Sequence, residues 1–371
     1  MKSQTPNMQF GTSRFLQAHA DLFISEARAE GQAVGPICVV QSSGDASRAK
    51  RVQALATPFK VKIEGLENGM PLKKDVEVSS ITKGLSTAEN WAEISRIFVH
   101  EAQIVLSNTG DAGFAPQPAD EGDVFNQAMS FPAKLTLLLR ARFEAGGAPI
   151  QIMPMELVSR NGEVLKARVM ELAQTASPVF IRYLEDDVLW VNSLVDRIVS
   201  QPLEPVGAVA EPYALWAIEV QDRLIMPCVH PAVQGVASLA DIEALKLFVL
   251  NLGHTVLADR WLAAKGAMSV TVRELMDTPA EREHLQAVYM AEVRPGFDAA
   301  GLAEDFAAYV ATTLERFANP FLDHAIVDIS QNHRMKVGRR IAAFLKFARD
   351  HGDHSPKPIL GDICARWQET T

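Results

Sequence analysis

Short apolar runs and helical patterns alternate through the first half of this chain, and this alternation constrains its fold more than any other feature. The apolar runs are rich in β-branched residues, as is typical of buried strands, and cover residues 37–43, 102–108 and 148–157. The helical patterns cover residues 14–31, 87–100, 131–146 and 161–174. Strands that alternate with helices in this way predict an α/β fold with a mostly parallel, doubly wound sheet.

The pattern changes near residue 200, where a segment with three prolines, residues 201–212, looks like a linker. Beyond this segment helical patterns dominate and strand signals are nearly absent. The sequence therefore predicts an α/β domain over residues 1–205 and a mostly α-helical domain over residues 206–371. Within the first domain, residues 59–65 and 75–81 alternate with period two and predict an antiparallel excursion.

Charge and composition argue against several classes of protein. The 371 residues carry 36 Lys and Arg against 45 Asp and Glu, a net charge of −9. A chain without a long basic run is a poor nucleic-acid binder, and no apolar stretch is long enough to span a membrane. Cys38, Cys228 and Cys364 are too far apart for a CxxC metal site, and no secretory signal is visible at the start. We expect reduced thiols, no metal and a cytoplasmic protein.

The first candidate site is the turn Gly11-Thr12-Ser13, which joins a short apolar run to a helical pattern. In a dinucleotide-binding fold, glycine at this turn lets the backbone approach the pyrophosphate, which lies at the helix N-terminus. Ser13 stands where a GxG pattern has its second glycine. The alternative interpretation is an ordinary glycine in a strand-to-helix turn.

A second candidate site directly follows the apolar run at 102–108, where the chain reads Ser107-Asn108-Thr109-Gly110-Asp111. Ligands of open α/β sheets bind outside the carboxyl ends of the strands. The segment therefore predicts contacts to the ribose or nicotinamide of a dinucleotide. The alternative is a turn and helix cap, since Ser, Asn, Thr and Asp all cap helices.

The most specific candidate lies in the helical pattern at residues 240–264, which is apolar on nearly every side and therefore predicts a buried helix. It nevertheless contains Lys246, Asn251 and His254, which fall within an arc of about 140° on a regular α-helix. Burial lowers the pKa of a lysine towards neutrality, the property that a general base needs. The alternative is a lysine that reaches solvent beside a capping Asn and a core His.

A cationic cluster near the end of the chain consists of His324, Lys336, Arg339 and Arg340. Guanidinium groups pair with both oxygens of a carboxylate. The cluster therefore predicts recognition of an acidic substrate, and the sequence leaves open which of the four makes the contact. The alternative is a solvated helix end.

Segments spread over nearly the whole chain resemble the polyol-specific long-chain dehydrogenases, the mannitol dehydrogenase family. In order along the chain they are QFGTSRFLQAHADLF, SNTGDAGF, FPAKL, MPMELVSRNG, NSLVDRI, the KxxxxNxxH pattern of 246–254, and RFANPFLDH. The second segment resembles the tagaturonate reductases. Some family members have an asparagine where this chain reads Met155-Glu156-Leu157, whereas the sugar-acid members, tagaturonate and fructuronate reductases, have Cys-Glu-Leu. The motifs therefore resemble the sugar-acid branch most.

The resemblance implies a Rossmann-type dinucleotide-binding domain, followed by a helical substrate and catalytic domain without a metal. It implies that Lys246 is the general acid/base, with Asn251 and His254 holding the substrate oxygen. The implied cofactor-binding residues are Gly11, Thr12, Ser13, Phe15, Leu16, Ser107, Asn108, Thr109 and Asp196. The substrate-binding candidates are Asn161, His324, Lys336, Arg339 and Arg340. Whether Asn161 replaces the missing family asparagine is open, and Gln17 stands where the family often has Arg.

Together these features predict an NAD(P)-dependent oxidoreductase acting on an open-chain sugar acid, of the tagaturonate–altronate or fructuronate–mannonate type. A mannitol-type polyol 2-dehydrogenase is the alternative enzyme, and a non-catalytic cofactor-binding homologue is the alternative from another class. The family and Asp45 favour NAD, whereas Arg48, Lys50 and Arg51 would suit the 2′-phosphate of NADP. We expect a monomer or homodimer with a small-molecule partner.

Overall fold

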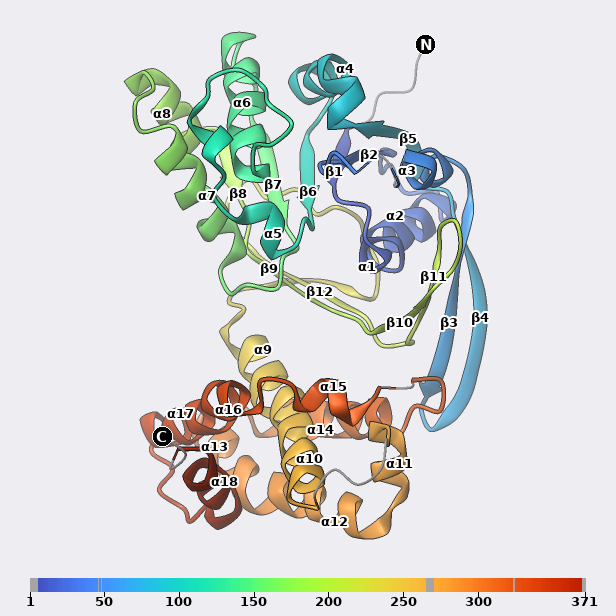
Figure 1. The fold of residues 1–371 in the computed structure, drawn as a ribbon, viewed down its shortest axis with the longest axis vertical. Helices are drawn as coiled ribbons and strands as arrows, with labels where there is room; N and C mark the ends of the chain where they lie inside the picture. The colour runs from blue at the N-terminus through green and yellow to red at the C-terminus, as the bar shows by residue number, and fades with distance from the viewer. Residues whose placement is uncertain (1–5, 46, 48, 265–269, 323, 369–371) are drawn as a thin grey trace. The chain divides into compact units, whose positions relative to one another are not determined.

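The computed structural model describes residues 6–45, 47, 49–264, 270–322 and 324–368, which form two compact units (Figure 1). The first unit comprises Met1–Ile63 and Lys73–Leu239, and the second comprises Glu64–Leu72 and Ala240–Thr371. The first unit thus continues past residue 205, where the sequence places a domain boundary.

The first unit is built around a six-stranded parallel sheet with the order β5-β2-β1-β6-β7-β8. Its strands are β1 (Asn7–Phe10), β2 (Ile37–Gln41), β5 (Ile81–Ser86), β6 (Ile104–Ser107), β7 (Ile150–Pro154) and β8 (Val188–Trp190). The strands β1, β2, β6 and β7 are buried along their whole length, as expected of a parallel sheet covered on both faces. The predicted α/β fold with a mostly parallel sheet is confirmed.

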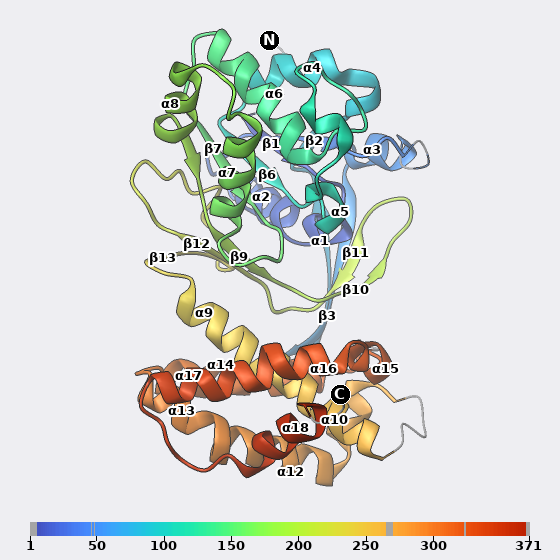
Figure 2. The same cartoon turned by 60° about the vertical axis from the view of Figure 1, so that its left-hand side comes forward.

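Helices cover both faces of this sheet because successive side chains of a strand point to opposite sides. Met8 and Phe10 of β1 pack with α4, α6, α7 and α8 in one apolar cluster, whereas the Gln9 amide points to the other face, 3.5 Å from the Asp21 carboxylate of α2. In Figure 2, α6, α7 and α8 lie side by side. The helices are α1 (Arg14–Gln17), α2 (Ala20–Ala29), α3 (Ala49–Leu55), α4 (Thr87–His100), α5 (Asp111–Phe114), the 3₁₀ turn η2 (Pro118–Glu121), α6 (Phe131–Glu144), α7 (Asn161–Leu172) and α8 (Pro178–Asp186).

Two smaller sheets complete the first unit, in the orders β10-β11-β3-β4 and β13-β12-β9. Their strands are β3 (Phe59–Glu67), β4 (Met70–Val78), β9 (Ser193–Asp196), β10 (Val199–Pro202), β11 (Ala208–Ala210), β12 (Leu215–Glu219) and β13 (Val233–Val236). The sequence predicts a mostly α-helical domain from residue 206, whereas residues 208–236 contain the strands β11, β12 and β13. The last four strands have only three to five residues each, too few for a period of two to stand out.

The second unit is helical apart from the tip of the β3–β4 hairpin, where Asn68 and Gly69 both adopt positive φ, as a two-residue hairpin turn requires. Its helical segments are α9 (Ala240–Leu245), η3 (Lys246–Asn251), α10 (Leu252–Ala263), α11 (Val272–Asp277), α12 (Pro279–Val288), η4 (Tyr289–Val293), α13 (Arg294–Ala299), α14 (Ala303–Phe317), α15 (Ile326–Ser330), α16 (His333–Lys336), η5 (Val337–Ala342), α17 (Ala343–Asp350) and α18 (Pro358–Gln368). The segments η3, η4 and η5 are π-helical. The predicted helical C-terminal domain is confirmed.

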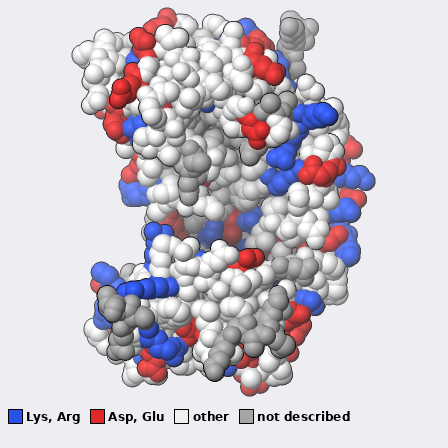
Figure 3. Space-filling model, viewed as in Figure 1, with Lys and Arg blue, Asp and Glu red and all other residues white. Residues whose placement is uncertain are grey.

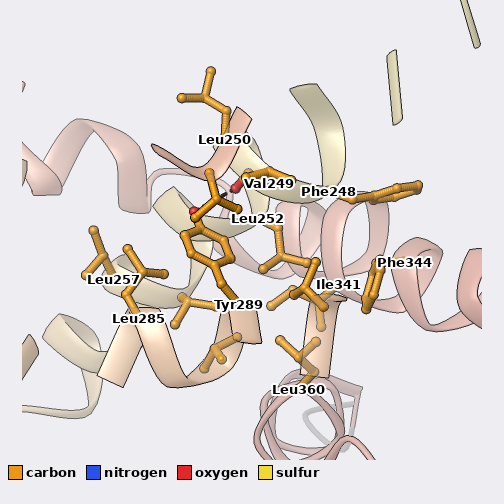
Figure 4. Packing of buried hydrophobic residues seen from close by; sticks show 14 of the residues in the cluster. Phe248, Val249, Leu250, Leu252, Leu257, Leu285, Tyr289, Ile341, Phe344 and Leu360 are labelled. Atoms are coloured by element: carbon orange, nitrogen blue, oxygen red, sulfur yellow. Dashed lines mark hydrogen bonds between the residues drawn. The ribbon is translucent and has the colours of Figure 1, made fainter. Parts of the chain in front are cut away.

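The core of the second unit forms around the continuous helix α9-η3-α10, most of whose apolar side chains are buried, whereas Leu247 is only partly buried (Figure 4). The fully buried Tyr289 hydroxyl donates a hydrogen bond of 2.9 Å to the carbonyl of Val249. A Cβ at Gly253 would lie 1.9 Å from that hydroxyl oxygen. Glycine at this position therefore lets the two helices approach closely enough for the Tyr289 hydroxyl to reach η3.

The described part of the chain contains no helix that is long and apolar enough to cross a membrane. On the face drawn in Figure 3, acidic and basic side chains occur over both units.

Candidate active site

The candidate cofactor site lies where the order of the main sheet reverses. Strands β1, β2 and β5 follow one another to one edge, whereas β6, β7 and β8 follow one another to the other. Phe10 at the end of β1 aligns with Ser107 at the end of β6. The backbone N–H of Asn108 donates to the Phe10 carbonyl at 2.9 Å. Dinucleotides bind outside the carboxyl ends of the strands at such a reversal. The residues that directly follow β1 and β6 therefore mark the site.

The turn after β1 requires the glycine that the sequence places there. Gly11 has a φ of 130°, and a Cβ at this position would lie 2.5 Å from the Asn108 carbonyl oxygen. Any side chain would push apart the two loops that follow β1 and β6. Ser13 then caps α1 by accepting the Leu16 amide at 3.2 Å, and its hydroxyl donates to the Asn108 side-chain oxygen at 3.1 Å. The turn is thus a closed loop that is held by hydrogen bonds within the protein.

The remaining predicted residues of this turn face the protein. The Thr12 carbonyl accepts from the Gln17 side chain at 3.2 Å. Leu16 is fully buried, and the Phe15 ring stacks on His19 with centroids 4.7 Å apart. These side chains support the turn from the protein side. The backbone of the turn is the part that is left to contact a ligand.

Arg14 is a basic residue of the same turn that the sequence reasoning missed, although it stands within the quoted motif. Its guanidinium donates to the Gly207 carbonyl at 3.1 Å and pairs with Glu204 at 2.8 Å. Burial lowers the pKa of Arg14, and the positive charge of Arg51 lowers it further. Two cations therefore lie near this turn, and the charge of Arg14 is paired with Glu204.

The polar residues after β6 are held by a buried carboxylate that the sequence reasoning also missed. Glu156 accepts from the Ser107 hydroxyl and from the Thr109 amide, each at 3.0 Å. The Asn108 amide group donates to the Met155 carbonyl at 2.9 Å. Burial raises the pKa of Glu156, and the donated hydrogen bonds oppose this shift. The side chain of Asp111 lies outside the described part of the chain.

Asn161 has all of its side-chain hydrogen-bonding capacity filled by the backbone. Its amide group donates to the carbonyls of Glu156 at 3.1 Å and Ser193 at 2.8 Å, and its oxygen accepts the amides of Gly162 and Ser193 at 3.0 Å. The residue is 1% exposed. In this structure Asn161 joins β9 to the start of α7 and has no donor or acceptor left for a substrate.

Asp196 ends β9, where it aligns with Leu215 of β12 and is nearly buried. It lies close to His19, whose Nε2 is 2.9 Å from the Leu215 carbonyl. Burial lowers the pKa of His19 to about 3, although the Leu215 carbonyl and the Asp196 charge oppose the shift. His19 is therefore neutral at physiological pH.

In the second unit, the predicted catalytic residues border the π-helical segment η3. Lys246 begins η3 and Asn251 ends it, and both are half-buried rather than enclosed. A π-helical turn is wider than an α-helical turn, so the arc predicted for a regular helix does not apply. His254 follows one turn later and is 7% exposed.

The imidazole of His254 is the most unusual polar group of this unit. It packs against Phe317, with ring centroids 4.3 Å apart, and meets His324 edge-on at 5.3 Å. Its Nε2 atom is buried and finds no hydrogen-bond partner among the described residues. Burial holds the pKa of His254 far below its usual range, and four neighbouring basic groups lower it further. A buried ring nitrogen without a hydrogen-bond partner is available to bond a ligand oxygen.

These four basic groups are His324, Arg340, Arg316 and Lys336. The Arg340 guanidinium donates to the Asn251 carbonyl at 3.2 Å and the Thr255 hydroxyl at 3.1 Å. The Lys336 ammonium donates to the Ile329 carbonyl at 2.7 Å. Burial lowers the pKa of both residues, which indicates a site that favours an anion.

Three of the four basic residues predicted for the substrate lie together in the structure, and one further basic residue joins them. His324, Lys336 and Arg340 lie around His254, whereas Arg339 is exposed. Arg316 of α14 is 6% exposed and joins the group; it begins the RFANPFLDH segment, so its motif offered a signal that was not used. Within the described ranges, no three His, Cys, Asp or Glu side chains could hold a metal ion.

Comparison with known proteins agrees with this architecture. Residues 7–226 match the mannitol dehydrogenase Rossmann domain, and residues 238–367 match the mannitol dehydrogenase C-terminal domain. The altronate oxidoreductase of Halalkalibacterium halodurans is 29% identical over 98% of this chain and 75% of its own length, and that of Bacillus subtilis is 25% identical over 96% and 78%.

Two solved structures share the fold. A substrate-free D-sorbitol dehydrogenase has a TM-score of 0.80 at 18% identity, covering 95% of this chain and 77% of that one. The Pseudomonas fluorescens mannitol 2-dehydrogenase, a ternary complex with NAD and D-mannitol, has a TM-score of 0.76 at 18% identity, covering 99% and 79%.

Proposed function

Since the chain belongs to the mannitol dehydrogenase family, we propose that it is an NAD-dependent oxidoreductase that interconverts a secondary alcohol and a ketone on an open-chain sugar acid. The observation that carries this proposal is the group of basic side chains around the buried imidazole of His254. Relatives named altronate oxidoreductase support the same substrate class, because altronate is a sugar acid.

The first unit is proposed to hold the cofactor. The closed turn at Gly11 brings the backbone next to the pyrophosphate, with Ser13 and Arg14 beside it, and Ser107–Thr109 lie at the ribose and nicotinamide. When bound, NAD supplies the nicotinamide carbon that accepts or returns the hydride.

The choice of NAD over NADP rests on the loop after β2. Asp45 lies in this loop with an exposed carboxylate that accepts the Ser47 hydroxyl at 2.6 Å. An acidic residue after the second strand commonly binds the ribose 2′-hydroxyl of NAD. Of the cations that would suit a 2′-phosphate, Arg48 lies outside the described residues. The positive charge of Arg51 lowers the pKa of Arg14.

The second unit is proposed to carry the proton chemistry. In oxidation, the Lys246 amine would take the proton of the substrate hydroxyl as that carbon becomes a ketone. In reduction, Lys246 returns the proton to the oxygen. His254 stays neutral because of its lowered pKa, so with Asn251 it can hold the reacting oxygen without adding a competing charge.

The substrate carboxylate is proposed to bind the basic group of this unit. Arg340 and Lys336 donate only to neutral oxygens among the described residues, so their charges are available to an anion. Arg316 adds to the positive field. Burial lowers the pKa of His324, so its imidazole is neutral at physiological pH and adds a polar group rather than a charge. The exposed Arg339 is too open to water to contribute much.

A substrate panel followed by nicotinamide absorbance tests this function. The purified protein should oxidise aldonates such as altronate and mannonate, and reduce the matching ketouronates, with NAD(H). If mannitol or arabinitol reacts faster than every sugar acid, the polyol 2-dehydrogenase alternative replaces the proposal. Binding of NADH without turnover of any substrate would identify a non-catalytic homologue.

A further inference from the structure

Lys134 is a buried cation for which neither the proposed chemistry nor the fold gives an evident use. It lies in the first turn of α6 and is 2% exposed. Its ammonium makes one hydrogen bond among the described residues, to the Ser42 carbonyl oxygen at 2.8 Å. No carboxylate of the described chain forms an ion pair with it. Burying an ammonium without an ion-pair partner is costly, so the charge calls for an explanation.

Three side chains surround the carbonyl that Lys134 contacts. The Gln127 amide group donates to it at 3.0 Å. The Thr87 hydroxyl lies 3.1 Å from it and 2.9 Å from the Gln127 oxygen, and its single proton can be donated to only one of the two at a time. Neutral donors therefore lie within reach of both lone pairs of this oxygen, so holding the Ser42 carbonyl does not by itself require a charge.

The position of Lys134 suggests what the charge serves. Ser42 directly follows β2, so it opens the loop that reads the adenosine ribose in a dinucleotide-binding fold. Lys134 reaches this loop from α6, which packs over β1, since the Phe131 and Phe10 rings are 5.2 Å apart. Its ammonium thus lies at the carboxyl end of β2, and the neighbouring strand β1 leads into the turn proposed for the pyrophosphate.

We propose that Lys134 is a positioning residue for the dinucleotide, which fixes the loop after β2 through the Ser42 carbonyl and directs a buried positive charge at the pyrophosphate. This inference rests on the proposed NAD site. The loop that it fixes is otherwise held from within, because the Gln41 amide group donates to the carbonyls of Ser43 at 2.9 Å and Asp45 at 2.8 Å.

The charge of Lys134 should respond to pH within an accessible range. Burial lowers the pKa of Lys134 to about 8, against the attraction of the Asp120 carboxylate in η2. Asp120 itself pairs with Arg168 of α7 at 3.0 Å, whereas Thr87 of α4 and Gln127 are neutral. Above this pKa the ammonium loses its proton, and the attraction for the pyrophosphate is lost with it.

The test is the affinity for NADH, measured by fluorescence or calorimetry, in K134M, T87V and a control, K60M. Lys60 is an exposed lysine of the same unit. K134M should weaken NADH binding about tenfold and T87V by about threefold or less, the difference between a charged and a neutral donor. K60M should bind like the wild type, and kcat of K134M at saturating cofactor should stay within about twofold.

The pH dependence separates a charge effect from mere loss of packing. In the wild type, NADH affinity should fall as pH rises from 7 to 9.5, with a midpoint near the pKa of Lys134, whereas in K134M it should be flat. A flat wild-type profile, or equal affinity in K134M and wild type, overturns the proposal even if K134M folds poorly in other respects. If the wild type does not bind NADH at all, the proposed function fails instead.

Discussion

The candidate sites of the two units differ in how their polar side chains are paired. In the first unit, the side chains that follow β1 and β6 are already bonded within the protein, as Ser13 is to Asn108 and Ser107 is to Glu156. In the second unit, the His254 Nε2 has no partner among the described residues, and Arg340 donates only to neutral oxygens.

This difference indicates two modes of recognition. Side chains that are already paired build a fixed frame, so we propose that the first unit binds its ligand through the backbone at the turn of Gly11. We propose that the His254 nitrogen and the cations without charged partners among the described residues are the recognition groups of the second unit. Substitutions in the first unit should therefore change stability and cofactor affinity together, whereas those in the second should change turnover or substrate KM.

The largest effect is expected at Lys246. Lys246→Ala removes the proposed general acid/base, so kcat should fall by at least about 100-fold, the usual share of this kind of catalysis. NADH affinity should be unchanged, because the variant leaves the first unit intact. Lys346→Ala, at an exposed lysine of α17 that pairs with Asp350, is the matched control and should keep wild-type kcat. Wild-type turnover in Lys246→Ala would assign the proton transfer to another group.

The next effect separates two neighbouring arginines. Arg340→Met should raise KM for a sugar acid by about tenfold to 100-fold, the range of a charge-assisted contact, and leave activity on a neutral polyol unchanged. Arg339→Met, which alters an exposed side chain one residue earlier, should leave KM nearly as it is. Arg340→Met also removes two hydrogen bonds. The melting temperatures of both variants test whether the rise in KM comes from this loss of structure instead. Equal KM values in the two variants would contradict the placement of the carboxylate.

A third prediction concerns the histidines that each unit keeps neutral by burial. His19 has a pKa of about 3 in the folded protein, and about 6.5 in the unfolded chain. The unfolded state binds the extra proton between these values, so the stability from His19 is present above pH 6.5 and is lost as pH falls below it. At pH 5 the loss is about 2 kcal/mol.

Denaturant unfolding of the wild type and His19→Phe at pH 7 and pH 5 measures this loss. The variant keeps an aromatic ring against Phe15 and Trp216 but cannot take up a proton. Its free energy of unfolding should therefore fall less between the two pH values. Parallel losses in both proteins would show that other groups control acid unfolding.

The sequence predicted the fold class, the family and the relation to sugar-acid oxidoreductases correctly. The sheet could be predicted because runs such as residues 102–108 have an apolar centre, here Ile104–Leu106, and the resemblance rested on motifs along the chain. The strands between residues 199 and 236 were missed because each is short and is recognised only by its pairing, as Ala208–Ala210 pairs with β3.

The candidate site shows the same limit. Lys246, Asn251 and His254 share one helix, so their spacing was visible in the sequence, although the π-helical segment that changes it was not. Arg316 joins His254 only through packing of α14 against the central helix. Glu156 meets Ser107 only because β6 and β7 are neighbours. Contacts between residues far apart in the chain depend on tertiary structure, which local patterns do not contain.

The smallest expected effect tests the frame of the first unit at the turn that the sequence singled out. Gly11→Ala places a Cβ 2.5 Å from the Asn108 carbonyl oxygen at a φ of 130°, so the free energy of unfolding should fall by on the order of 1 kcal/mol. NADH affinity should fall with it, because the loops after β1 and β6 move apart. Gly31→Ala is the matched control: it also has a positive φ, but its Cβ would meet nothing within 4 Å, so it should lose stability without losing NADH affinity. If both variants bind NADH like the wild type, the close approach at Gly11 serves the fold alone and the backbone cradle must lie elsewhere.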